Sequence, residues 1–148
     1  MPALTASCAR ATVTAMDISL TTVRMFIHVL AATIWVGGQL TLAGLVPAVR
    51  TLGPDAPRTV ARRFNLVAWP AFVVLTFTGI WNALSVDFAN QPASYNVKFG
   101  LKMTCYLATG FGAALHAFVR KRWALALGGA MSALGAVGAL FFAMALRY

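Results

Sequence analysis

Four long apolar runs, separated by charged residues, constrain this sequence most strongly. No Asp, Glu, Lys or Arg interrupts the ranges 25–49, 64–86, 103–119 and 123–146. A helix needs about 20 apolar residues to cross the roughly 30 Å hydrocarbon core of a bilayer. The third run reaches this length if it begins near residue 98 and its lysines extend toward the headgroups. We therefore predict an all-α fold, an integral membrane four-helix bundle with spans at about 25–49, 64–86, 98–119 and 123–146.

The composition supports a membrane protein. Hydrophobic residues make up 60% of the 148 residues and charged residues only 10%, whereas a soluble domain carries about 25% charged residues. The formal net charge of +9 arises from 12 Lys and Arg against 3 acidic residues. These basic residues flank the apolar runs, so they mark the edges of a lipid bilayer rather than a nucleic-acid-binding surface. We expect a bilayer around the chain and no nucleic acid partner.

The basic residues also predict an orientation in the bilayer. Two connections on one side hold Arg50, Arg58, Arg62, Arg63, Arg120, Lys121 and Arg122. The opposite side holds Arg10, Arg24, Lys98, Lys102 and Arg147. Because cytoplasmic loops are enriched in Lys and Arg, we place the two Arg-rich connections in the cytoplasm and both termini outside. Residues 1–21 are expected to form a disordered tail without a cleavable signal peptide, ahead of one membrane domain over 22–148.

Polar residues inside the spans are the best candidates for a functional site, because such groups are costly in a bilayer. At about 100° per residue, one face of the third span is polar along its length. Its members are Lys98, Lys102, Cys105, Thr109, Gly112 and His116. We interpret Lys98, Lys102, Thr109 and His116 as a polar path that faces the bundle interior or a wet cavity. The alternative is that the hydroxyl and thiol groups only bond to backbone.

A candidate copper site lies in the outer layer of the predicted bundle. His28 lies one turn inside the outer edge of the first span, and Met25 shares its face; Cys105 and Met144 fall in the same layer. Imidazole accepts several metals, while thiolate and thioether select Cu(I). These four residues are therefore candidate copper ligands, although a His and a Met at a helix end are also an ordinary packing pair.

Haem b is the alternative cofactor. At 1.5 Å per residue, His28 and His116 differ in depth by roughly 20 Å, which is too far for both to ligate one iron. A haem held by His28 together with Met or another ligand remains open, since His and Met ligation is a known haem pattern.

Two stripes of small residues predict close packing between helices. The first span carries Thr33, Gly37, Thr41, Gly44 and Ala48, and the last carries Gly128, Ser132, Gly135 and Ala139. Lipid gives no hydrophobic drive between helices, so such stripes let backbones approach closely.

Two motifs resemble the copper-resistance protein D family of bacterial inner membranes. They are HVLAATIWVGG over residues 28–38, and RFN at 63–65 followed by TGIWNA at 78–83. The family-like positions are His28, Trp35, Gly37, Gly38, Arg63, Phe64, Gly79, Asn82 and Lys102. The resemblance implies copper handling, commonly uptake across the inner membrane with a periplasmic copper-binding partner, and among these positions His28 is the obvious metal ligand. This chain differs in having only four spans and no loop rich in Met or His.

The leading hypothesis is thus a copper-handling protein of the bacterial plasma membrane, by binding or by uptake. A looser resemblance to the HemJ-type protoporphyrinogen oxidases, small bundles with a His in the first span and a Lys opening a later one, implies a haem-binding redox protein instead. A non-catalytic assembly subunit, including a homo-oligomer, is the third alternative. The chain has no Glu, catalytic triad, P-loop or zinc motif, so we lean away from an enzyme.

Overall fold

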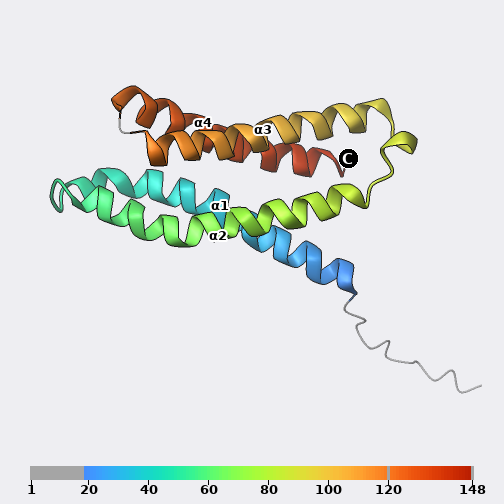
Figure 1. The fold of residues 1–148 in the computed structure, drawn as a ribbon, viewed down its shortest axis with the longest axis horizontal. Coiled ribbons are helices and arrows are strands. Elements are labelled where there is room, and N and C mark those ends of the chain that lie inside the picture. Colours follow the sequence, from blue (N-terminus) through green and yellow to red (C-terminus); the bar gives the residue numbers. More distant parts are fainter. Residues whose placement is uncertain (1–18, 120, 148) are drawn as a thin grey trace, which may run out of the picture.

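The chain folds into four α-helices and one short 3-10 helix (Figure 1). The computed structural model describes residues 19–119 and 121–147. The helices are α1 (Leu20–Arg50), α2 (Ala56–Leu84), η1 (Phe88–Asn90), α3 (Ala93–Phe118) and α4 (Arg122–Ala145). No strand occurs in these described ranges, so the predicted all-α fold is confirmed.

The helices match the predicted spans in number and order, but most of them begin earlier. α2 starts at Ala56, well before the predicted residue 64, and passes through Arg58 and Arg62. Charged residues limit an apolar run without breaking a helix, because Arg is a good helix former. Residues 1–18 of the predicted tail lie outside the described residues, and α1 already begins at Leu20.

Three of the described helices, α1, α2 and α4, are long and apolar enough to cross a membrane. α3 has a comparable length of 26 residues, but Lys98, Lys102 and His116 interrupt its apolar stretches. Large hydrophobic side chains such as Phe26, Phe77 and Leu134 lie exposed on the helices. These surfaces are compatible with a multi-pass membrane protein, whose lipid-facing side chains need no protein cover.

The fold consists of two antiparallel hairpins, α1 with α2 and α3 with α4 (Figure 1). The turn between α1 and α2 requires Gly53, whose φ of 133° favours glycine. Within the α1–α2 hairpin, the centre of the Trp35 ring lies 4.4 Å from that of Phe72, and the Phe72 ring in turn stacks at 5.2 Å on Tyr106 of α3 in the other hairpin. Large aromatic side chains therefore join the two hairpins.

The α3–α4 interface is built on glycine. A Cβ added at Gly112 would lie 2.6 Å from the backbone nitrogen of Ser132, and one added at Gly135 would lie 2.7 Å from the carbonyl oxygen of Cys105. Gly128 likewise faces backbone atoms of α3. The backbones therefore approach as closely as the small-residue stripe of the last span predicts.

The corresponding prediction for α1 is wrong within this chain. No atom would lie within 4 Å of a Cβ added at Gly37 or Gly44, and Thr33 and Thr41 are exposed. α1 packs instead through its opposite face, where Trp35 is buried. Aromatic side chains cover the face of α1 that carries Trp35, so the small residues lie on the outer surface of this helix.

Candidate functional site

His28 is held by a hydrogen bond from α1 to α2. Its Nδ1 lies 2.8 Å from the Thr78 hydroxyl oxygen, and that hydroxyl donates to the carbonyl of Val74 at 2.7 Å. A hydroxyl has only one proton to donate. Because the Thr78 hydroxyl donates its proton to the Val74 carbonyl, it accepts a hydrogen bond from His28. We therefore assign the ring proton to Nδ1, which leaves Nε2 as a free lone pair. Gly79 makes room, because a Cβ there would lie 3.3 Å from the ring.

Lys102 of α3 joins His28 from the other hairpin. Its positive charge lies within electrostatic range of the imidazole. Asn82 lies one turn beyond Thr78 on α2, and its buried Oδ1 has no hydrogen-bond partner among the described residues. We call His28, Thr78, Asn82 and Lys102 the His28 cluster. It offers a free imidazole nitrogen, an unmet acceptor and a cation.

A second cation lies one turn from His28 on α1. A terminal nitrogen of Arg24 donates to the Ser85 hydroxyl at 2.9 Å, and its guanidinium carbon lies 5.3 Å from the centre of the Trp81 ring. The acidic residues in the described part of the chain, Asp55 and Asp87, precede α2 and η1. The helices themselves contain no carboxylate, and the acidic residue at this end of the α1–α2 hairpin is Asp87, two residues after Ser85.

The other predicted copper ligands occupy different surroundings. Cys105 directs its sulfur into the α3–α4 interface, where a Cβ added at Gly138 would lie 2.8 Å from it. Met144 is 53% exposed near the end of α4, and Met25 is half-buried one turn before His28. Within the described ranges, no group of three or more His, Cys, Asp or Glu side chains is arranged to hold a metal. The four-ligand set stays a prediction.

Three of the four residues of the predicted polar path face α4. The Lys98 ammonium donates to the Ala145 carbonyl at 3.0 Å, where a cation is favourable at a helix C-terminus. Thr109 donates to the Ser132 carbonyl at 2.7 Å, and His116 Nδ1 lies 2.7 Å from the Leu125 carbonyl. Each of these three residues thus has a partner on α4, whereas Lys102 lies within electrostatic range of His28.

A buried hydrogen-bond network links α1, α3 and α4 at mid-depth. The Trp35 indole donates to the Thr109 hydroxyl at 3.1 Å, and the Ser132 hydroxyl donates to Gln39 Oε1 at 2.9 Å. Thr109 is only 1% exposed. We call Trp35, Gln39, Thr109 and Ser132 the central network. In an interior of low dielectric, such a network fixes how the hairpins meet.

Sequence reasoning missed several partners of these residues. It did not identify Thr78 beside His28 or Gln39 beside Ser132, and it also missed the hydrogen bond between the Thr76 and Tyr106 hydroxyls. A usable signal existed for Thr78, because a polar side chain in the second span lies at the depth of His28. The rotation of each helix about its axis, which decides the actual pairs, was not available from periodicity alone.

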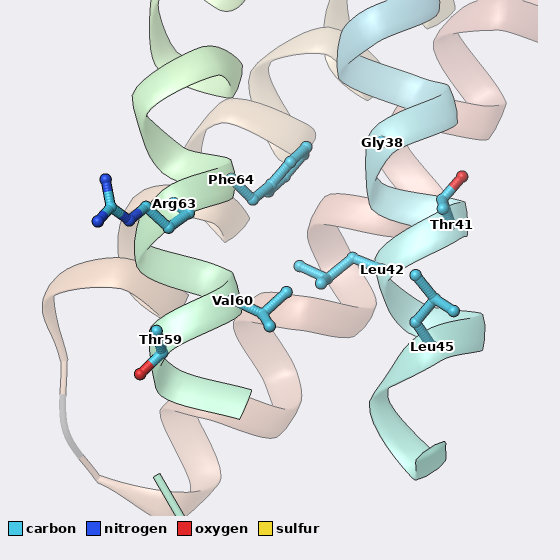
Figure 2. Close-up of a pocket in the computed structure, with 8 residues that line it drawn as sticks. All are labelled: Gly38, Thr41, Leu42, Leu45, Thr59, Val60, Arg63 and Phe64. Atoms are coloured by element: carbon cyan, nitrogen blue, oxygen red, sulfur yellow. The ribbon is translucent and has the colours of Figure 1, made fainter. Parts of the chain in front are cut away.

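Three further family-like residues, Gly38, Arg63 and Phe64, line a groove between α1 and α2. The Phe64 ring fills the space beside Gly38, so a Cβ there would clash with it. Figure 2 shows the neighbouring groove between α1 and α2, about 460 Å³, with Leu42 and Val60 facing each other across it. Arg63 points away from α1 in this view (Figure 2). This groove is almost wholly apolar, so it offers little chemistry of its own.

Comparison with known proteins found no family model, no curated protein and no solved structure that matches the chain. Its function is therefore inferred from its own residues and their geometry.

Proposed function

We propose that this chain binds copper ions at the outer end of its bundle, in a bacterial plasma membrane, with Nε2 of His28 as the central ligand. The observation that carries the proposal is the 2.8 Å contact between His28 Nδ1 and Thr78. A metal-binding imidazole almost always uses its other ring nitrogen as a donor to an oxygen, which fixes the ring. Met25, three residues earlier, supplies a thioether, which favours Cu(I).

Because few candidate ligands surround His28, we extend the proposal from binding the ion to passing it on. An ion that is to be passed on must bind well enough to enter and weakly enough to leave. Cys105 and Met144 are further soft ligands, which would have to turn toward His28 to contribute. With both termini outside, the His28 end would face the periplasm, where a copper-binding partner would deliver the ion. In its broader version, the proposal includes uptake of the ion across the membrane.

The test is copper retention by the purified protein in lipid nanodiscs. The protein is loaded with Cu(I), challenged with a competing chelator and analysed for metal. We expect His28→Ala to lose the retained copper and His116→Ala, a matched control on α3, to keep it. Equal copper retention in wild-type protein and His28→Ala would refute the proposal.

Haem b is a second candidate, favoured by the charge of Lys102 beside His28. A nearby cation opposes Cu(I) but stabilises an anion such as a haem propionate. The donor set fits this group: His28 would supply a nitrogen ligand to the iron, and Lys102 and Arg24 would hold the propionates. Bound haem would supply electron transfer.

The same preparation separates the candidates. Haem would give a Soret band in protein from haem-sufficient cells that disappears in His28→Ala, whereas copper would give metal without that band. A protein that binds neither would fit a non-catalytic assembly subunit.

A further inference from the structure

A cavity of about 270 Å³ lies between the two hairpins in their inner half, away from the His28 cluster. Its polar and aromatic lining consists of Trp35, Gln39, Phe64, Asn65, Trp69, His116 and Ser132. The rest of the lining is apolar, mostly Ala, Leu and Val. Cavities of this kind, apolar with a few convergent polar groups, are typical of small-molecule sites.

His116 contributes a hydrogen-bond acceptor to this cavity. Its Nδ1 lies 2.7 Å from the carbonyl oxygen of Leu125, and a carbonyl can only accept, so Nδ1 carries the ring proton. Nε2 of the neutral ring is then a free acceptor. Gly129 contacts the ring, since a Cβ there would lie 3.2 Å from Nδ1. The imidazole is thereby fixed at the cavity wall.

Gln39 contributes an unmet donor. Its Oε1 accepts from the Ser132 hydroxyl at 2.9 Å, but its Nε2 is buried and has no hydrogen-bond partner among the described residues. Buried polar groups are nearly always paired, so such an exception calls for an explanation. A bound oxygen acceptor would supply the missing partner.

The walls of the cavity favour a flat ring. The rings of Trp35 and Trp69 lie 6.0 Å apart in an edge-to-face arrangement, and aromatic faces stack on aromatic ligands. The helices around the cavity have membrane-compatible apolar surfaces, so a ligand that enters between them from the bilayer would be soluble in lipid. We propose that the cavity binds a small membrane-soluble aromatic ring carrying a hydroxyl and a second oxygen, the chemistry of a quinol.

In this complex, Gln39 Nε2 donates to one ligand oxygen and the ligand hydroxyl donates to His116 Nε2. The inference goes beyond copper or haem binding, because no residue of the His28 cluster lines the cavity. The two proposals can therefore fail separately.

Duroquinol is the probe. We would measure its binding to the protein in lipid nanodiscs by equilibrium dialysis, with empty nanodiscs as the blank. We expect saturable binding above that blank, and a loss of about tenfold in affinity for Gln39→Leu and for His116→Leu, the size of one net hydrogen bond. Thr41→Leu, which alters α1 outside the cavity, should bind like wild type, and so should His28→Ala.

A second ligand tests the hydroxyl. Duroquinol dimethyl ether keeps the oxygens but lacks the protons, so it should bind wild-type protein less tightly and lose less affinity on His116→Leu than duroquinol does. Binding no greater than in empty nanodiscs would overturn the proposal. Unchanged duroquinol affinity in both Gln39→Leu and His116→Leu would overturn it equally.

Discussion

The α3–α4 hairpin and the α1–α2 hairpin meet the same bilayer requirements in different ways. In the first, glycines bring the backbones together, and Lys98, Thr109 and His116 each find a carbonyl on α4. The buried side-chain atoms without partners in the described residues belong to the second, at Arg24, Gln39 and Asn82. The α1–α2 hairpin therefore retains buried hydrogen-bonding atoms for a ligand, whereas the α3–α4 hairpin uses Lys98, Thr109 and one nitrogen of His116 for folding and offers a ligand only Lys102 and the other His116 nitrogen.

The largest expected effect comes from breaking the tight hairpin with Gly135→Leu. A Cβ at this position already lies 2.7 Å from the Cys105 carbonyl oxygen, so a larger side chain must push the backbones apart. Overpacking of this kind costs typically about 1–3 kcal/mol, and contact with backbone places it at about 3 kcal/mol or more. The free energy of unfolding in detergent measures it.

Gly37→Leu is the matched control for that change. Nothing lies within 4 Å of a Cβ at Gly37, so stability should change by less than about 0.5 kcal/mol, as for other surface substitutions. Equal destabilisation by both substitutions would contradict the difference between the hairpins.

The next effect concerns the central network, through which the hairpins meet. Thr109→Val removes the acceptor of the Trp35 indole, and a buried donor left without a partner costs about 1–3 kcal/mol. Thr104→Val is the control, because Thr104 is exposed on the same helix and bonds only to the Gly100 carbonyl. If the two variants unfold at the same denaturant concentration, the network does not hold the hairpins together.

The difference between the hairpins also explains what the sequence could predict. Charges separated the chain into four segments in the right order, because a bilayer penalises a buried charge wherever it occurs, but they did not fix where the helices begin, as α2 starts at Ala56. Helical periodicity grouped Lys98, Thr109 and His116 on one face, yet it could not say that α4 would cover that face. For α1 it could not tell which of two opposite faces would pack, so the stripe with Gly37 was assigned wrongly. The argument that His28 and Lys102 lie at one depth uses only residue spacing, and it stays a prediction.

A smaller effect should follow at the His28 cluster. Thr78→Val removes the oxygen that fixes the His28 ring, and loss of such a partner typically weakens metal binding by about 10- to 100-fold. The measurement is the copper affinity, or the haem content if a Soret band is present. Thr33→Val is the control, since this exposed Thr bonds only to the Val29 carbonyl. Undiminished affinity in Thr78→Val would show that ring orientation is not part of the site.

The smallest effect tests whether the polar groups of the α3–α4 hairpin are structural. Lys98→Met keeps the length of the side chain but removes the ammonium that donates to the Ala145 carbonyl. A cation at a helix C-terminus contributes about 0.3–1 kcal/mol, so the free energy of unfolding should fall by that amount. Copper retention should stay unchanged, because Lys98 already has its partner on α4. A large loss of copper with unchanged stability would instead assign Lys98 to an ion path, and its hydrogen bond to the Ala145 carbonyl would then not be its main role.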